Sequence, residues 1–274
     1  MNRSLFTKLL PVAFFSLSSV AFAIPASVTI GDNFVGGQDN VVPARDVIGD
    51  ANAFDIQNMA ITIDRAAGTL QVKIATQWFD PTLNGTFNFG PGYDVQSGDL
   101  FISTNGWTPF GPAPHAGDNA SNGTAWNGTA SNYVFDTSNG NIYGGGFSVS
   151  LTQNEIVGPL LDPTGDFAYR NNQETRRSGG GTVVGTGTVA STLAADGSIA
   201  FFTYDLLLAD LGITNPNDPI ALGFHWTMTC ANDVMETGII SDGGGIRPSE
   251  TPEPGTLLLL GMGLLGFGLR RRVS

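Results

Sequence analysis

Residues 54–76 read FDIQNMAITIDRAAGTLQVKIAT, and apolar and polar side chains alternate in this stretch on both sides of a short polar segment. The apolar positions are Phe54, Ile56, Ile61 and Ile63 before that segment, and Leu70, Val72 and Ile74 after it. Alternation with a period of two indicates strands that bury one face, and residues 64–68 have the composition of a turn. The stretch therefore predicts a β-hairpin with one buried face.

Further strand candidates recur at short intervals along the rest of the chain. They are residues 99–104, 132–136, 142–151, 182–190, 198–208, 219–230 and 236–241, with one helical turn or a short helix expected in 205–212. Turn residues separate them and no helical period is sustained between them, which favours antiparallel pairing. We expect an all-β fold, with residues 24–241 forming one antiparallel β-sandwich or jelly roll. Residues 105–131 and 162–181 are expected to be long loops.

Composition and charge narrow the classes of function. The chain has 274 residues, of which 41% are hydrophobic, so a sizeable core can form. Five of the 12 basic residues lie at the two ends, which leaves seven basic against 24 acidic residues in 24–269, a net charge of −17. Such a surface repels phosphate backbones, so we expect no nucleic-acid partner. Cys230 is the only cysteine, which excludes an intrachain disulfide and cysteine-based zinc sites.

The first 23 residues, MNRSLFTKLLPVAFFSLSSVAFA, are typical of a signal peptide. A basic start is followed by an apolar stretch at 9–20, and Ala21 and Ala23 form an A-x-A cleavage site. We therefore expect cleavage after Ala23 and export of the chain.

The carboxyl end combines three features in a fixed order. They are the tripeptide Pro252, Glu253 and Pro254, an apolar stretch at 256–269, and the cluster Arg270, Arg271 and Arg272. As a helix the apolar stretch would cover about 21 Å, less than a ~30 Å hydrocarbon core, so we expect a short single transmembrane helix that anchors weakly. The arginines are expected to remain cytoplasmic. Residues 242–251 are expected to be a flexible spacer before the tripeptide.

This three-part tail, residues 252–274, resembles the PEP-CTERM sorting signal of Gram-negative bacteria. The resemblance implies recognition by a membrane-embedded exosortase, transient anchoring in the inner membrane, and cleavage near residues 252–254. It also implies display at the cell surface or release outside the cell, often in organisms that make extracellular polysaccharide. Segments 87–102 and 222–236 are similar to stretches in other proteins with such a tail, which implies a β-sandwich cargo and assigns no catalytic residue.

His225 and Cys230 both lie in the strand candidate 219–230. Alternation places Cys230 on the apolar face with Phe224 and Trp226, and places His225 on the more polar face. Cys230 is interpreted as a small core residue. His225 is interpreted as a hydrogen-bonded sheet histidine, with a metal or sugar site as the alternative.

Catalysis finds little support among the residues. There are two histidines, His115 and His225, with no G-x-S-x-G elbow and no paired-carboxylate strand motif. We therefore expect no enzymatic activity, no catalytic residues and no cofactor. The alternative to the absence of a cofactor is a calcium ion bound in aspartate-rich loops. Turns explain the same aspartates equally well. The candidate ligands are Asp32, Asp39, Asp46 and Asp50, or Asp162 and Asp166.

Trp107 and Trp126 lie in the polar loop region 105–131 and are the best candidates for stacking on a glycan ring. An ordinary place in the core or at its rim is the alternative for both. We expect an exported surface or matrix protein, structural or associated with extracellular polysaccharide. A lectin-like carbohydrate-binding module is the alternative function, and a secreted glycoside hydrolase is a third.

Overall fold

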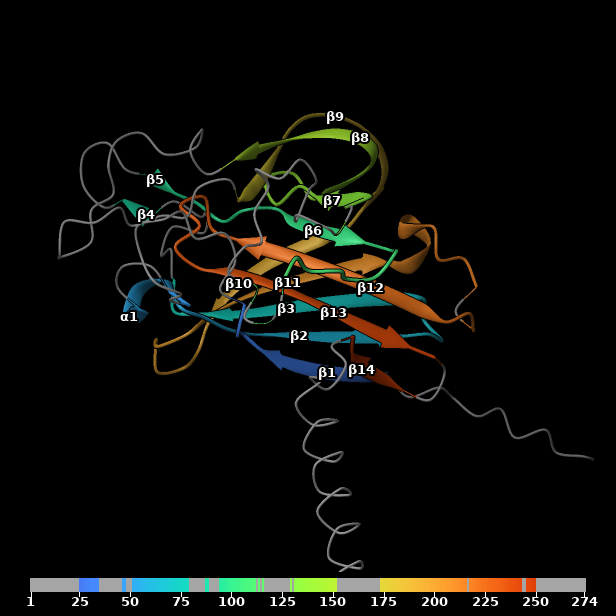
Figure 1. Ribbon diagram of the computed structural model, residues 1–274, viewed down its shortest axis with the longest axis horizontal. Helices are drawn as coiled ribbons and strands as arrows, with labels where there is room; N and C mark the ends of the chain where they lie inside the picture. The colour runs from blue at the N-terminus through green and yellow to red at the C-terminus, as the bar shows by residue number, and fades with distance from the viewer. Residues whose placement is uncertain are drawn as a thin grey trace, which may run out of the picture.

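The computed structural model describes residues 25–34, 46–47, 51–78, 87–88, 94–111, 113, 115, 129, 131–151, 173–215, 217–242 and 245–249. Its fold is all-β (Figure 1), as predicted, and the described helices are the four-residue α1 (Ala51–Phe54) and the 3-10 helix η3 (Leu208–Leu211). The strands form two large antiparallel sheets and one two-stranded sheet. The two-stranded sheet pairs β4 (Phe87–Asn88) with β5 (Asp94–Val95).

The hairpin predicted in residues 54–76 is confirmed as β2 (Ile56–Asp64) and β3 (Thr69–Thr76). Its register pairs Ile61 with Val72, and both side chains are buried. The turn between the strands ends at Gly68, which adopts a φ of 69°, a left-handed conformation that glycine reaches without strain. Alternation and turn chemistry therefore act together to set this register.

The hairpin lies at the centre of a five-stranded antiparallel sheet. The strand order is β1 (Ala26–Gly31), β2, β3, β11 (Ala200–Leu207) and β10 (Thr188–Leu193). Along β11, buried and more exposed residues alternate, as one-sided burial requires.

The second sheet has seven antiparallel strands. Its order is β14 (Ile246–Pro248), β13 (Val234–Ser241), β12 (Ile220–Thr227), β6 (Leu100–Ser103), β7 (Tyr133–Phe135), β8 (Asn141–Leu151) and β9 (Glu174–Thr186). Register shifts interrupt the long β8–β9 ladder at four places, and the pair curves over the top of the molecule in Figure 1. The edge strands β1 and β14 lie together at the bottom of the same view.

One hydrophobic cluster joins the two large sheets. It contains Ile61 and Val72 of the five-stranded sheet and Phe224 of the seven-stranded sheet, all fully buried. Trp226 donates its ring N–H to the hydroxyl of Tyr204 across the two sheets at 2.9 Å. The two sheets thus pack face to face, and the polar ends of their largest side chains are bonded to one another.

The structure corrects the sequence predictions in three places. The predicted loop 162–181 is strand from Glu174 onward, because β9 begins there. The predicted strand 182–190 is two strands that meet at Gly187, where the chain passes from one sheet to the other. The predicted spacer 242–251 contains β14, so the sheet continues past residue 241. The jelly-roll connectivity stays a prediction.

Candidate functional site

The outer face of the seven-stranded sheet carries a set of buried polar residues. Leu222, Phe224 and Trp226 of β12 point into the core, which leaves His225 on the opposite face of the strand. His225 is nevertheless completely buried. The register places it opposite Glu236 of β13 on one side and Phe101 of β6 on the other. The polar face predicted for His225 is thus interior to the molecule.

His225 and Glu236 form a buried hydrogen-bonded pair. Nδ1 of His225 lies 2.8 Å from Oε1 of Glu236, and Nε2 lies 2.7 Å from the carbonyl oxygen of Glu174. Because a carbonyl oxygen only accepts, Nε2 carries a hydrogen. Nδ1 then either accepts a hydrogen from a protonated Glu236 or donates one to its carboxylate. In both forms, one proton is held between the two side chains.

The environment of Glu236 favours its protonated form. Burial raises the pKa of Glu236 to about 8, and the hydrogen bond that Trp107 donates offsets part of this rise. That bond joins Nε1 of Trp107 to Oε2 of Glu236 at 3.1 Å. The proton shared with His225 means that the buried Glu236 carboxyl group is not left as an isolated charge in the interior.

Trp107 lies between this pair and the surface. It is half-buried and packs edge to face against both Phe34 and His115, at ring-centroid distances of 6.4 and 5.4 Å. Phe34 and His115 stack on each other at 5.8 Å. Trp126 lies outside the described residues, so the pairing of the two tryptophans on a glycan stays a prediction. The edge of Trp107 that carries its N–H is bonded inside the protein.

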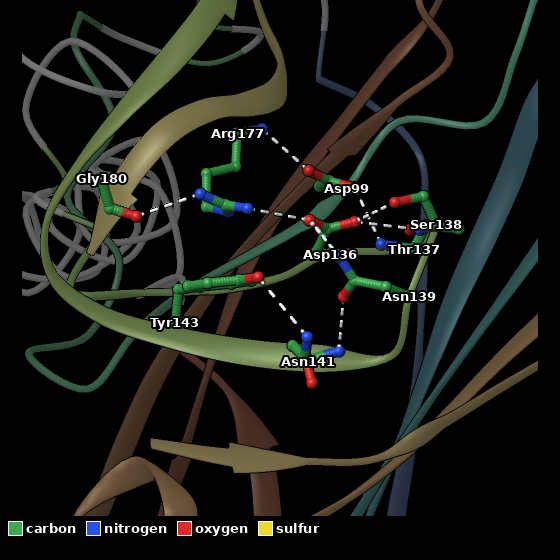
Figure 2. Close-up of polar contacts among 9 residues, drawn as sticks. All are labelled: Asp99, Asp136, Thr137, Ser138, Asn139, Asn141, Tyr143, Arg177 and Gly180. Atoms are coloured by element: carbon green, nitrogen blue, oxygen red, sulfur yellow. Dashed lines mark hydrogen bonds and ion pairs between the residues drawn. The ribbon is translucent and has the colours of Figure 1, made fainter. Parts of the chain in front are cut away.

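A second polar cluster ties β9 to the strands beside it (Figure 2). Arg177 of β9 makes an ion pair with Asp136 at 3.2 Å, and both side chains are largely buried. The guanidinium also donates to the carbonyl oxygen of Gly180 at 3.0 Å and lies 3.5 Å from the centre of the Tyr143 ring. Arg177 therefore connects the β7–β8 turn with both strands of the curved β8–β9 pair.

Asp99 lies at the base of the same cluster. Its two carboxylate oxygens accept hydrogen bonds from the backbone N–H groups of Thr137 and Arg177, both at 2.8 Å. Burial raises the pKa of Asp99 to about 7, although the two backbone hydrogen bonds act in the opposite direction. Asp136, in turn, accepts from the backbone N–H and hydroxyl of Ser138. These contacts fix backbone positions, so the cluster supports the architecture of this corner.

A third group could hold a cation. Asp32, Asp46 and Asp233 each offer a carboxylate oxygen, and the three oxygens lie within 4.8 Å of one another. Two oxygens on opposite sides of a calcium ion are about 5 Å apart, given Ca–O distances of 2.3–2.6 Å, so the spacing fits calcium. Asp233 is also structural, because it accepts from the backbone N–H groups of Ile56 and Val234 at 2.6 and 2.8 Å.

The structure describes some of the residues that the sequence singles out. Cys230 is fully buried in the main core, as predicted, and His225 is a hydrogen-bonded sheet histidine. Asp32 and Asp46 come together among the calcium candidates. The other residues predicted for function lie outside the described residues. They are Ala21, Ala23, Asp39, Asp50, Trp126, Asp162, Asp166, Pro252, Glu253, Pro254, Arg270, Arg271 and Arg272.

Sequence reasoning missed several members of these groups, among them Asp233, the carbonyl of Glu174, and the cluster of Asp99, Asp136 and Arg177. Asp233 follows a strand and reads as a turn residue, and only the packing of β13 beside β2 brings it to Asp32. The carbonyl of Glu174 belongs to a segment predicted as a loop. Asp99 could have been recognised from the sequence, because it is the first residue of the apolar strand candidate 99–104. A carboxylate buried at such a position needs hydrogen-bond donors around it.

Comparison with known protein families gives one match, at the end of the chain. Residues 250–272 match the PEP-CTERM protein-sorting motif. No curated protein and no solved structure matches the chain. Among the described residues, no helix has both the length and the apolar character needed to cross a membrane, and the predicted stretch 256–269 lies outside them. Residues 250–272 thus carry the predicted sorting signal, the PEP-CTERM protein-sorting motif.

Proposed function

We propose that this protein is a non-catalytic component of the cell surface or extracellular matrix, released to that location by an exosortase. The observation that carries the proposal is the sorting motif at residues 250–272, which implies an exported protein targeted to an exosortase. The predicted signal peptide at 1–23 would bring the body of the chain to the same side of the membrane. The proposed role is structural, in a matrix or biofilm that contains extracellular polysaccharide.

The buried polar groups support a structural role over a catalytic one. Glu236 and Asp99 have raised pKa values, which often mark catalytic acids. In this protein their oxygens bond to groups of the fold, namely Trp107 and His225 for Glu236, and backbone N–H groups for Asp99. Structural networks perturb pKa values in the same way, so these acids are accounted for without a substrate.

Intact mass tests the processing part of the proposal. Protein recovered from the medium or cell surface should begin at Ile24 and end close to residues 252–254. Replacing Glu253 with Gln should leave the precursor in the membrane fraction, because the motif then lacks its carboxylate. A mature protein that still contains Arg270–Arg272 would contradict exosortase processing.

A carbohydrate-binding role is the second candidate, favoured by the place of Trp107 near the surface beside two other aromatic rings. Trp107→Ala and Trp126→Ala should then each weaken retention on the producer's polysaccharide. Stacking worth ~1–3 kcal/mol predicts a loss of roughly ten- to a hundredfold, by analogy with stacking on bases. Trp107→Phe is the matched control, because it keeps an aromatic face and removes only the N–H donated to Glu236. Unchanged retention in the double alanine variant would leave the structural role alone.

A further inference from the structure

The last described strand, β14, joins the sheet immediately before the sorting motif. Its register pairs Ile246 with Ser241, Arg247 with Ile240, and Pro248 with Ile239 of β13. The backbone N–H of Ser249 then donates to the carbonyl oxygen of Gly238 at 2.8 Å. The chain is thus bonded to the sheet as far as Ser249, and the matched motif begins at residue 250.

Side chains add to this attachment. Ile246 is half-buried and packs against the main core. Gly238 permits the close approach of Ser249, because a Cβ at position 238 would lie 2.4 Å from Oγ of Ser249. Arg65 holds Ser241, the last residue of β13, in place. Its guanidinium donates to the carbonyl oxygen and to the hydroxyl of Ser241, both at 2.9 Å.

The attachment is nevertheless limited. β14 has three residues, it is the edge strand of its sheet, and Arg247 and Pro248 are exposed. Proline has no N–H to donate, so Pro248 can contribute only its carbonyl oxygen to the ladder. Short edge strands with few buried side chains open at low cost compared with the rest of a fold. β14 can therefore leave β13 while the two large sheets stay packed.

The spacing between β14 and the motif is very short. Pro252 follows Ser249 by three positions, and three residues reach at most about 11 Å. Proteins that bind peptides in extended form commonly pair with several consecutive backbone groups of the ligand. An enzyme that binds a few residues before residue 252 in this way would use the same N–H and C=O groups that β13 uses in the folded protein.

We infer that residues 246–249 are a transferable segment, which pairs with β13 in the folded protein and must be released for the sorting enzyme to bind the motif. The inference rests on the proposed processing by an exosortase and adds a recognition segment to it. Release as far back as Ser241 lengthens the distance along the chain from the last residue bonded to the sheet to Pro252 from three positions to eleven, or to about 40 Å at full extension. Unpairing of β14 therefore precedes cleavage.

A reversible lock on β14 tests this order of events. Ile240 and Arg247 lie opposite each other in the ladder, so Ile240→Cys together with Arg247→Cys can form a disulfide between the two strands. Cys230 is buried and does not compete for oxidation. The full-length double variant is placed in membranes of the producing cell, and intact mass follows the loss of the carboxyl tail. The oxidised form should lose its tail at least tenfold more slowly than the reduced form.

Two further variants test whether the slower processing is caused by holding β14 on β13 or by introducing any disulfide into the fold. Thr62→Cys with Gln71→Cys places the same kind of disulfide across the β2–β3 pair, away from β14, and should leave the rate unchanged. Eight Gly and Ser residues inserted after Ser249 supply free chain without unpairing, and should restore the rate of the oxidised Ile240→Cys, Arg247→Cys variant to within about twofold of the unaltered chain.

The outcomes distinguish this inference from the proposed function. Equal rates for the oxidised and reduced lock would overturn the inference while processing itself stands. Failure of the inserted residues to rescue the locked chain would also overturn it. Retention of Arg270–Arg272 by the unaltered chain, or normal processing of Glu253→Gln, would overturn the proposed function and this inference with it.

Discussion

Glu236 makes the stability of this fold depend on pH. A folded-state pKa of about 8, above the ordinary value of 4.5, stabilises the fold fully below pH 4.5. That contribution is lost as the pH rises toward 8, because the unfolded chain releases the proton first. Gln at position 236 keeps the shape of the protonated acid, with an N–H for His225 and an oxygen for Trp107.

We therefore expect the stability difference between the unaltered protein and Glu236→Gln to fall steadily from pH 4.5 to pH 8. The slope should approach about 1.4 kcal/mol per pH unit. Denaturant unfolding at a series of pH values measures it. A difference that does not change with pH would mean that the folded protein holds no proton between Glu236 and His225.

Among the described glycines, Gly98 has the closest backbone atom to an added side chain. Its N–H donates to the carbonyl oxygen of Thr227, and an added Cβ would lie 2.2 Å from that oxygen and 2.6 Å from the carbonyl oxygen of Thr175. Both neighbours are backbone, so neither can rotate away. Gly98→Ala should lose about 3 kcal/mol or more of unfolding free energy, the upper range for overpacking.

Gly31→Ala is the matched control, because a Cβ at that position in β1 meets nothing within 4 Å. It should change stability by no more than about 0.5 kcal/mol. Urea unfolding of the two variants compares them directly. Similar stability losses for both would show that the backbone around Gly98 relaxes by more than this structure implies.

At the scale of single elements, local pattern was sufficient where a strand alternates cleanly. β2, β3 and the turn at 65–68 follow from the positions of their apolar residues, and η3 falls within the predicted helical turn at 205–212. β6, β7, β8, β11, β12 and β13 also lie within a few residues of their predicted bounds. Apart from β8, which is half-buried or exposed over most of its length, these strands bury apolar side chains along their length.

The sequence pattern did not predict elements whose position depends on partners far along the chain. Gly187 divides β9 from β10, and an added Cβ would lie 2.3 Å from the carbonyl oxygen of Asp205. This close approach requires glycine, but the surrounding Gly, Thr and Val residues look like one continuous strand. β14 was missed for a similar reason, since three mostly exposed residues carry no pattern. The polar cluster of Asp99, Asp136 and Arg177 likewise depends on non-local pairing.

The calcium prediction concerns the group of Asp32, Asp46 and Asp233. Asp32 follows β1 and Asp233 precedes β13, so an ion bound there would connect the two large sheets. Under the prediction, millimolar calcium should raise the melting temperature and a chelator should reverse the rise. Asp46→Asn should abolish the effect, whereas Asp205→Asn, an exposed aspartate on β11, should keep it. A melting temperature of the unaltered protein that is the same with and without calcium would contradict the prediction.

At the scale of the whole molecule, the excess of negative charge opposes compactness. Residues 24–269 contain seven basic and 24 acidic residues, a net charge of −17, so ion pairs such as Arg177 with Asp136 and Arg247 with Asp242 can neutralise only a minority of the acids. Repulsion among the remaining acids destabilises the folded state more than the expanded unfolded chain. Salt screens this repulsion, because the Debye length shortens from about 30 Å at 0.01 M to about 8 Å at 0.15 M.

The melting temperature should therefore rise with sodium chloride over this range. A gain of about 1 kcal/mol corresponds to ~2–4 °C for a domain of this size, which differential scanning calorimetry resolves. The rise should flatten above 0.15 M, since the Debye length is then shorter than most distances between surface charges. A sucrose series serves as the control, because sucrose stabilises through exclusion from the surface and shows no such plateau. A melting temperature that falls with salt would mean that attractive pairs such as Arg177 and Asp136 outweigh the repulsion, and that the acids are arranged around bound or built-in cations.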